Sequence, residues 1–329
     1  MRRSIFVFVC LVPTLFLPTV PAAQQSGKIF RIGFLDNSTA SGMAVIVDAF
    51  RQELSKLGWI EGKNISIEYR FAEQKNERLH ELAGDLVHLK LDLIVATGTT
   101  SALAAKEATT SIPIVVANTS DPVGTGLVMS LAHPGGNITG FTSSAFEVNT
   151  KRLEILKDTF PKLTRVGVLR PPGRSAGIEN QLKELRPASL ALKLKLEEIE
   201  TELDGKALES AFQNAKQKQV GAITTVTSPR IFAERKRIVE LADKFHFPAI
   251  YFQKEFIDEG GLMFYGADYA DEFRSAAHYV DKILRGAKPA DLPVGQPTKF
   301  EFIINLKAAK QIGLTIPVRV LERANQVIR

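Results

Sequence analysis

The feature that most constrains the fold is a repeated alternation of two kinds of segment. Short runs rich in apolar and β-branched residues have the composition of buried strands. Longer segments between them carry apolar residues at helical spacing, and the first of these ends at Gly58, a residue typical of helix C-termini. Strands are expected at 28–35, 65–71, 91–97 and 112–118, with helices at 43–57 and 78–89. This order predicts a parallel sheet with helices on both faces.

The same alternation restarts after a boundary near Gly140 to Asn149. Strands are expected at 165–170, 195–201, 221–227 and 247–252, with helices at 177–192, 205–218 and 231–245. A chain of 329 residues is long enough for two hydrophobic cores. The sequence therefore predicts an α/β protein with two doubly wound parallel-sheet lobes.

Two further strand–helix units follow, and each needs a sheet to join. They are a strand at 260–266 with a helix at 269–285, and a strand running into a helix at 299–314. The simplest arrangement gives one unit to each lobe, so that the chain crosses between lobes near Thr142, Tyr265 and Pro289. Three crossings make a hinge beside a cleft. We therefore predict an N-terminal lobe of 28–142 plus 266–288 and a C-terminal lobe of 143–265 plus 289–329.

The N-terminus has the three-part layout of a secretory signal peptide over residues 1–23. Two arginines precede an apolar core at about 5–17, and Ala22 and Ala23 provide small residues for cleavage. The core is shorter than the roughly 20 residues of a membrane span, although an uncleaved anchor remains the alternative. Cleavage would remove the chain's only cysteine, which suits an oxidising compartment. We expect a soluble, periplasmic protein.

Small polar residues follow the predicted strands in both lobes. The segment "LIVATGTTSALAAKEAT" places hydroxyls where a buried strand meets a helix, and similar residues occur in "DNSTASG", "TSDPVGTG", "PPGRSAG" and "SPR". Ligands of open parallel sheets bind beyond the carboxyl ends of the strands, where helix N-termini favour anions. Each loop alone is equally consistent with an ordinary helix cap. Their recurrence predicts that they line one cleft and bind a carboxylate or another small anion.

Three charged or aromatic residues admit two interpretations each. Arg170 ends a second-lobe strand, where a guanidinium could pair with a ligand carboxylate or simply be solvated. Asp121 could hold a ligand ammonium, but Asp before Pro favours a turn. Tyr265, at the predicted second crossing, could stack on a ligand or belong to the core.

Several function classes have no support in the sequence. The five histidines form no metal-binding spacing, and neither a nucleophile elbow, a phosphate-binding loop nor a dinucleotide fingerprint occurs. No block of lysine and arginine accompanies the formal charge of +6. We therefore predict a protein that is not an enzyme, has no cofactor or metal, and does not bind nucleic acid.

Long segments of the chain resemble the ABC transporter substrate-binding protein family, in the branch of the tryptophan- and tyrosine-type binding proteins. The resemblance covers the mature chain and is carried above all by "IPIVVANTSDPVGTGLVMSLAHPGGNITG" and "ILRGAKPADLPVGQPTKFEFIINLKAAKQIGLTIP". It implies a type I periplasmic-binding-protein fold and a monomer without catalysis. Such a protein delivers a small solute to an inner-membrane ABC permease. The solute would be amino-acid-like or an aromatic acid, bound in the interlobe cleft by hinge closure.

The resemblance also implies which positions face the ligand. They are Ser38, Thr39, Thr97, Gly98, Thr99, Thr100, Ser101, Asn118, Asp121, Arg170, Thr227, Ser228 and Tyr265. Many relatives have Asn-Pro where this chain has Arg170-Pro171, and a cation there would favour a more negatively charged ligand than a zwitterionic amino acid. Two other functions stay open: a ligand-sensing module that feeds a signalling partner, and an enzyme on the same scaffold. A transcription factor is disfavoured, because no helix-turn-helix precedes Lys28.

Overall fold

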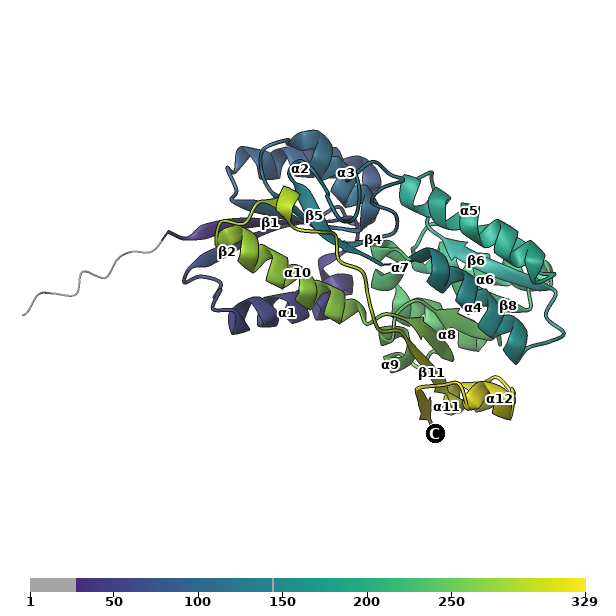
Figure 1. Cartoon of the computed structure of the whole chain (residues 1–329). Coiled ribbons are helices and arrows are strands. Elements are labelled where there is room, and N and C mark those ends of the chain that lie inside the picture. Colours follow the sequence, from purple (N-terminus) through teal and green to yellow (C-terminus); the bar gives the residue numbers. More distant parts are fainter. Residues whose placement is uncertain (1–27, 144) are drawn as a thin grey trace, which may run out of the picture.

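The computed structural model describes residues 28–143 and 145–329, so the predicted signal peptide lies outside the described residues (Figure 1). Within that part of the chain, no helix is both long and apolar enough to span a membrane. Figure 1 shows two lobes, with strands inside each and helices packed around them.

The first lobe is built on five parallel strands in the order β2-β1-β3-β4-β5. Its strands are β1 (Phe30–Asp36), β2 (Ile65–Phe71), β3 (Leu93–Thr97), β4 (Ile114–Thr119) and β5 (Ile138–Thr142). Its helices are α1 (Ala40–Lys56), the short 3-10 helix η1 (Asn76–Arg78), α2 (Leu79–His88), α3 (Gly98–Ala108) and α10 (Tyr269–Leu284). Every residue of β3 and β4 is buried, as expected of central parallel strands.

The second lobe is built on seven strands in the order β12-β11-β10-β9-β8-β6-β7. These are β6 (Arg165–Arg170), β7 (Lys195–Glu200), β8 (Ala222–Thr225), β9 (Ala249–Tyr251), β10 (Met263–Gly266), β11 (Glu301–Asn305) and β12 (Gln326–Ile328). Its helices are α4 (Ala145–Thr159), α5 (Ala176–Ala191), α6 (Gly205–Gln217), α7 (Pro229–Ala233), α8 (Arg235–Lys244), α9 (Glu255–Asp258), α11 (Leu306–Gln311) and α12 (Val318–Leu321). Among the strands that the structure describes, only β10 and β11 pair antiparallel.

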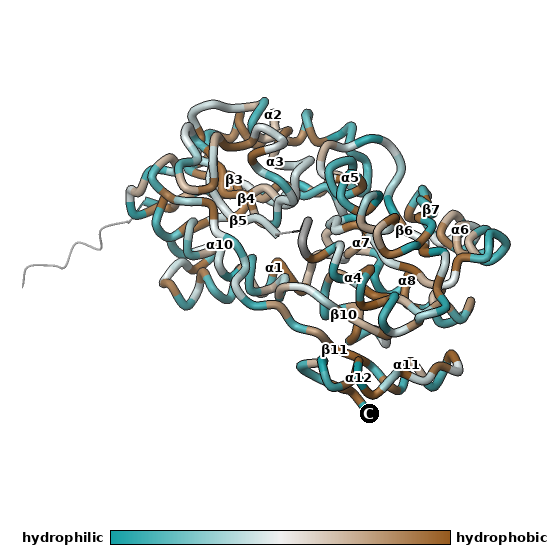
Figure 2. The backbone as a smooth tube through the Cα atoms, turned by 45° about the vertical axis from the view of Figure 1, so that its right-hand side comes forward, coloured by the Kyte–Doolittle hydropathy of each residue, from teal (hydrophilic) through white to brown (hydrophobic). Residues whose placement is uncertain are grey.

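Hydrophobic burial holds each lobe together. Figure 2 shows hydrophobic stretches running through the middle of the lobes and hydrophilic ones mainly at outer loops. In α10, Phe273, Ala276, Ala277 and Val280 are all fully buried. Their spacing places them on one face of the helix, which packs against α1 and the first sheet. This packing explains why a helix that follows β10 in sequence belongs to the first lobe.

The chain crosses between the sheets three times, as the sequence predicts. The first crossing follows β5, and the second lies between Gly266 and Asp268. The third comes later than the predicted Pro289. The 3-10 helix η2 (Pro289–Asp291) and the residues after it stay with the first lobe, where Gly295 N–H donates to Gly140 O at 2.8 Å.

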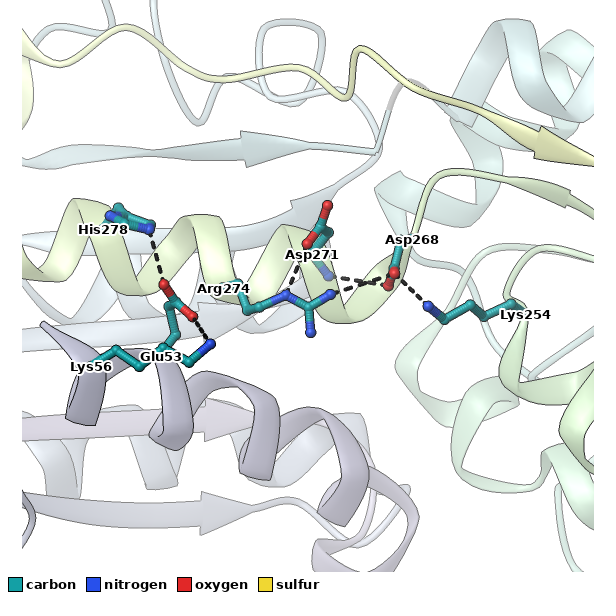
Figure 3. A network of polar contacts seen from close by, with 7 residues as sticks. All are labelled: Glu53, Lys56, Lys254, Asp268, Asp271, Arg274 and His278. Atoms are coloured by element: carbon teal, nitrogen blue, oxygen red, sulfur yellow. Dashed lines mark hydrogen bonds and ion pairs between the residues drawn. The ribbon is translucent and has the colours of Figure 1, made fainter.

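An ion-pair network surrounds the second crossing (Figure 3). Asp268 caps α10 by accepting from Asp271 N–H at 3.2 Å, and it pairs with Lys254 of the second lobe. Arg274 reaches the same carboxylate at 3.5 Å. These contacts tie the start of α10 to the second lobe at the hinge.

Other differences from the sequence prediction concern single elements. The boundary near Gly140 to Asn149 contains the end of β5 and the start of α4. The strand β5, "ITGFT", lacks a long apolar run, and Gly140 has φ of 142° where an added Cβ would lie 2.0 Å from Val116 O. The helix predicted at 231–245 is two helices, α7 and α8, separated by Glu234.

Candidate ligand-binding site

A cavity lies between the lobes, at the carboxyl ends of parallel strands of both sheets. It contains about 460 Å³ of atom-free space, part of which opens to solvent, and the centre of a water molecule fits in only about 30 Å³ of it. By the 10–15 Å³ that one water needs, this is room for about two waters. The first lobe contributes Asn37, Asn76, Gly98, Thr99, Thr100, Asn118 and Ser120. The second contributes Pro171, Ser175, Gly177, Ile178, Gln181, Thr227, Ser228, Pro229 and Arg230.

Of the five residues Thr97 to Ser101 where β3 meets α3, three line the cavity and two do not. Gly98, Thr99 and Thr100 line the cavity, and Thr99 Oγ1 lies 3.1 Å from Thr119 Oγ1 and 3.2 Å from Ser120 Oγ. Thr97 does not line it, because its hydroxyl donates to the buried Asp36 carboxylate. The fifth member, Ser101, is fully buried and does not line the cavity either.

Gly98 at the start of α3 has φ of 71°, a left-handed conformation that favours glycine. A Cβ there would lie 3.2 Å from Pro229 Cγ of the opposite lobe. Glycine at this position therefore also lets the two lobes approach closely.

Ser38 and Thr39, the predicted residues after β1, form hydrogen bonds with residues near them in sequence. Ser38 donates its hydroxyl and its N–H to Asp36, and Thr39 Oγ1 caps α1 by accepting from Gly42 N–H at 3.1 Å. Neither side chain lines the cavity, whereas Asn37, the residue before Ser38, does. These hydroxyls position the loop that presents Asn37.

Asn118 is the most constrained residue of the site. It has φ of 60° at an irregularity in the pairing of β4 with β5, a conformation that costs energy for a residue other than glycine. Its side-chain N–H donates to Glu272 of α10, which is buried. Burial raises the pKa of Glu272 to about 8. The amide of Asn118 is thus fixed on the wall of the cavity by a partner behind it.

Neither Asp121 nor Tyr265 lines the cavity. Asp121 accepts from Gly124 N–H at 2.7 Å, which fits the turn interpretation, and it also accepts from Asn180 of the second lobe at 3.2 Å. The Tyr265 ring stacks on Phe300, with centroids 6.3 Å apart. Its carbonyl accepts from Arg152 Nε at 2.8 Å.

Arg170 is placed differently from the prediction. Its guanidinium pairs with two glutamates of the neighbouring strand β7, at 3.3 Å from Glu198 and 2.6 Å from Glu200. The next residue, Pro171, lines the cavity in its place. Arg170 therefore satisfies its charge within the second lobe.

The second lobe presents Thr227 and Ser228, both predicted, and Arg230, which was not singled out. Gln181 accepts from Thr227 N–H at 2.7 Å and donates to Thr227 O at 2.9 Å, which fixes the end of this loop. Ser228 Oγ caps α7 by accepting from Arg230 N–H at 3.2 Å. The short segment "SPR" was the only sequence signal for Arg230.

Other cavity residues escaped sequence reasoning. Asn76 and Gln181 lie on helices, where nothing in the local pattern separates a cavity-facing amide from a solvated one. Ser120 and Ser175 lie in the strand-end loops "TSDPVGTG" and "PPGRSAG", which are predicted to line the cleft, but neither serine is predicted individually.

The lobes touch each other around the cavity. Gln74 of the first lobe accepts from Arg230 Nε at 3.1 Å and donates to Glu234 at 3.2 Å. Arg235 of α8 donates to Gly42 O of α1 at 2.9 Å. These contacts join the two lobes around a small cavity that opens in part to solvent.

The described residues contain no group of three or more histidine, cysteine or acidic side chains arranged to hold a metal ion. The cavity therefore offers a set of hydroxyl, amide and backbone groups with one guanidinium. Such a set binds small polar solutes through hydrogen bonds.

Comparison with known proteins agrees with this geometry. Residues 36–328 match the family model described as ABC transporter substrate binding protein. The chain belongs to the ABC transporter substrate-binding protein family. The predicted family resemblance is thereby confirmed, and with it a role as the substrate-binding protein of an ABC-type system. Members of this family bind small-molecule solutes, work with ABC permeases and are not enzymes.

Individual proteins are similar to this chain in sequence or in structure. A tyrosine-binding protein of Clostridioides difficile is 30% identical over 268 residues, covering 80% of this chain and 75% of that protein. The structure of a conserved domain protein from Vibrio cholerae has a TM-score of 0.83 at 27% identity, covering 91% of this chain and all of that one. An ABC domain from Streptococcus pneumoniae in complex with L-Trp has a TM-score of 0.80 at 25% identity, covering 91% and 99% of the two chains. These neighbours confirm the predicted two-lobed type I periplasmic-binding fold of this substrate-binding protein.

Proposed function

We propose that the protein is the extracytoplasmic solute-binding component of an ABC importer. It binds a small carboxylate-containing solute, amino-acid-like or an aromatic acid, between its lobes and delivers it to an inner-membrane permease. The predicted signal peptide directs it to the periplasm, where it acts as a monomer. The observation that carries this proposal is that strand-end loops of both sheets line one shared cavity.

The cavity lining supports the carboxylate class. Hydroxyls of Thr99, Thr100 and Ser228 and the amide of Asn37 supply hydrogen-bond donors on both sides. A carboxylate accepts several such bonds, each worth about 1.5–3 kcal/mol when one partner is charged. Tyrosine and L-Trp, the ligands named for two of the relatives, are carboxylate-containing amino acids and agree with this class.

The lobe contacts support binding by hinge closure. The solute first binds one lobe of the open form, and contacts to the other lobe then favour the closed form. Moving the closed fraction from 1% to 99% needs about 5.5 kcal/mol of differential binding. A few charge-assisted hydrogen bonds across the cavity supply this amount.

The proposal is tested on the mature protein purified from a periplasmic extract. Solute retained through purification is identified by mass spectrometry, and thermal shift is measured with L-tryptophan, L-tyrosine, 4-hydroxybenzoate and succinate. A bound acid raises the melting temperature, because it stabilises only the folded form.

A matched pair of variants then locates the binding. Thr99→Val removes a hydroxyl from the cavity wall and is expected to weaken binding. Thr225→Val removes a buried hydroxyl without a hydrogen-bond partner in the described chain, away from the cavity lining, and is expected to leave binding unchanged. A protein that binds none of the acids, or equal effects of the two variants, would refute the proposal.

A further inference from the structure

Arg230 is a buried cation on the wall of the cavity. It lies at the start of α7, and only 4% of the residue is exposed. It is also one of the residues that line the cavity. A guanidinium withdrawn from water in this way needs hydrogen-bond partners and a compensating charge.

The charge of Arg230 is only weakly compensated within the described chain. Its Nε donates to Gln74 Oε1, a neutral amide, at 3.1 Å. The carboxylate within ion-pair reach is that of Glu202, 3.9 Å from Nη2, and 65% of the Glu202 side chain is exposed. Burial accordingly lowers the pKa of Arg230 from its ordinary value. By contrast, Arg170 has two glutamates within 3.3 Å.

Gln74 is held rigidly where it meets Arg230. Glu73 and Gln74 both have left-handed backbones, with φ of 53° and 69°. Their N–H groups donate to Ser38 O at 3.0 Å and Asn37 O at 3.1 Å, which fixes this unusual conformation. The amide of Gln74 then donates to Glu234 and accepts from Arg230, so both of its ends are occupied. It orients the guanidinium without neutralising it.

We propose that Arg230 binds the carboxylate of the solute and that Gln74, from the opposite lobe, is its positioning residue. This inference rests on the proposed function and names the charge that the site selects. The solute supplies the anion that the buried guanidinium lacks, and closure aligns the guanidinium through Gln74. The site therefore prefers an acid over the uncharged amide of the same acid.

A rival role for Arg230 is purely structural, as a contact that keeps the lobes together. The two roles differ in what they predict for an acid and its amide. A structural contact supports closure on both ligands equally, whereas an anion-binding residue favours only the acid. The preference of acid over amide, compared between variants, isolates the charge interaction.

The experiment measures this preference by calorimetry with matched probes. These are L-tyrosine and L-tyrosinamide, L-tryptophan and L-tryptophanamide, 4-hydroxybenzoate and 4-hydroxybenzamide, and succinate and succinamate. In Arg230→Gln, the preference for the acid is expected to fall roughly 10- to 150-fold, the range for one charged hydrogen-bonded pair. Arg230→Lys keeps the charge without the planar fork and is expected to retain part of the preference.

Arg235→Gln is the matched control. Arg235 also bridges the lobes, by donating to Gly42 O, but it does not line the cavity. Its replacement is expected to weaken acid and amide alike and to leave the preference unchanged. Melting curves without ligand show whether each variant is folded.

The outcomes separate this inference from the proposed function. If the wild type prefers acids and Arg230→Gln keeps the full preference, Arg230 is a structural contact, and solute binding in the cleft still stands. If Arg235→Gln lowers the preference as much as Arg230→Gln, the assignment is also wrong. If no acid binds the wild type, both proposals fail.

Discussion

The proposed closure of the lobes can be tested with a single methyl group at Gly42. This residue lies in the first turn of α1 and faces α7 of the second lobe. A Cβ added there would lie 2.3 Å from Ala233 Cβ and 2.6 Å from Ala233 Cα. Carbon atoms pack best at about 3.5–4.0 Å, so the closed lobes would have to separate by roughly 1 Å or more.

The expected effects of Gly42→Ala on folding and on binding differ. Overpacking of this size costs about 1–3 kcal/mol, and here the cost falls only on the closed form. Solute affinity is therefore expected to fall about 5- to 150-fold. Within its own lobe the change removes a helical glycine, which is worth about 0.5–1 kcal/mol in stability. Crowding against Thr39 Oγ1, at 2.9 Å, offsets part of this gain.

Calorimetry gives the affinity, and small-angle X-ray scattering gives the radius of gyration with and without solute. Gly84→Ala is the control, because a Cβ there meets nothing within 4 Å. It is expected to add the same helical stability without changing binding or closure. Wild-type affinity in folded Gly42→Ala, with the same compaction on binding, would refute closure as drawn here.

Three further predictions concern single residues. Because the pKa of Glu272 is raised to about 8, the folded state binds its proton more tightly than the unfolded state. Stability is thus expected to fall by up to about 1.4 kcal/mol per pH unit as pH rises from about 5 to 8. Urea unfolding of Glu272→Gln should show a flatter pH profile, and an unchanged profile would contradict the assignment. Arg170→Ala is expected to change solute affinity by less than about fivefold in calorimetry, because Arg170 pairs with Glu198 and Glu200 and does not line the cavity; a larger loss would return Arg170 to the site. Gly140→Ala is expected to lower the melting temperature strongly, since its Cβ would overlap Val116 O, and a wild-type melting temperature would argue against the drawn pairing of β4 with β5.

Much of the fold could be predicted because local patterns determine it. The strand predicted at 65–71 has the same bounds in the structure. The helix predicted at 269–285 corresponds to α10, Tyr269–Leu284. The strand β5 could not be predicted, because its pairing depends on Gly140 approaching β4, a contact distant in sequence.

The role of an individual site residue could not be predicted from its type and its position in the sequence. Thr97 and Thr99 are the same residue type two positions apart, yet one binds Asp36 and the other lines the cavity. A hydroxyl suits both roles, so only the fold decides between them.

For the arginines Arg170 and Arg230 too, only the fold decides which one lines the cavity. Arg170 ends strand β6 of the second sheet, and Arg230 lies in α7, shortly after β8. Arg170 is neutralised because β7 pairs beside β6, with Glu200 directly opposite. The order of strands in the sheet, which places Glu200 beside Arg170, cannot be predicted from the local sequence around either arginine.

The proposed function requires a solute held between the lobes. Its most direct test is a crystal structure of the protein with the solute that it retains from the periplasm. We predict electron density in the cavity that contacts Thr99 or Ser120 on one side and Thr227 or Arg230 on the other. Density that touches one lobe alone, or lies outside the cleft, would contradict it.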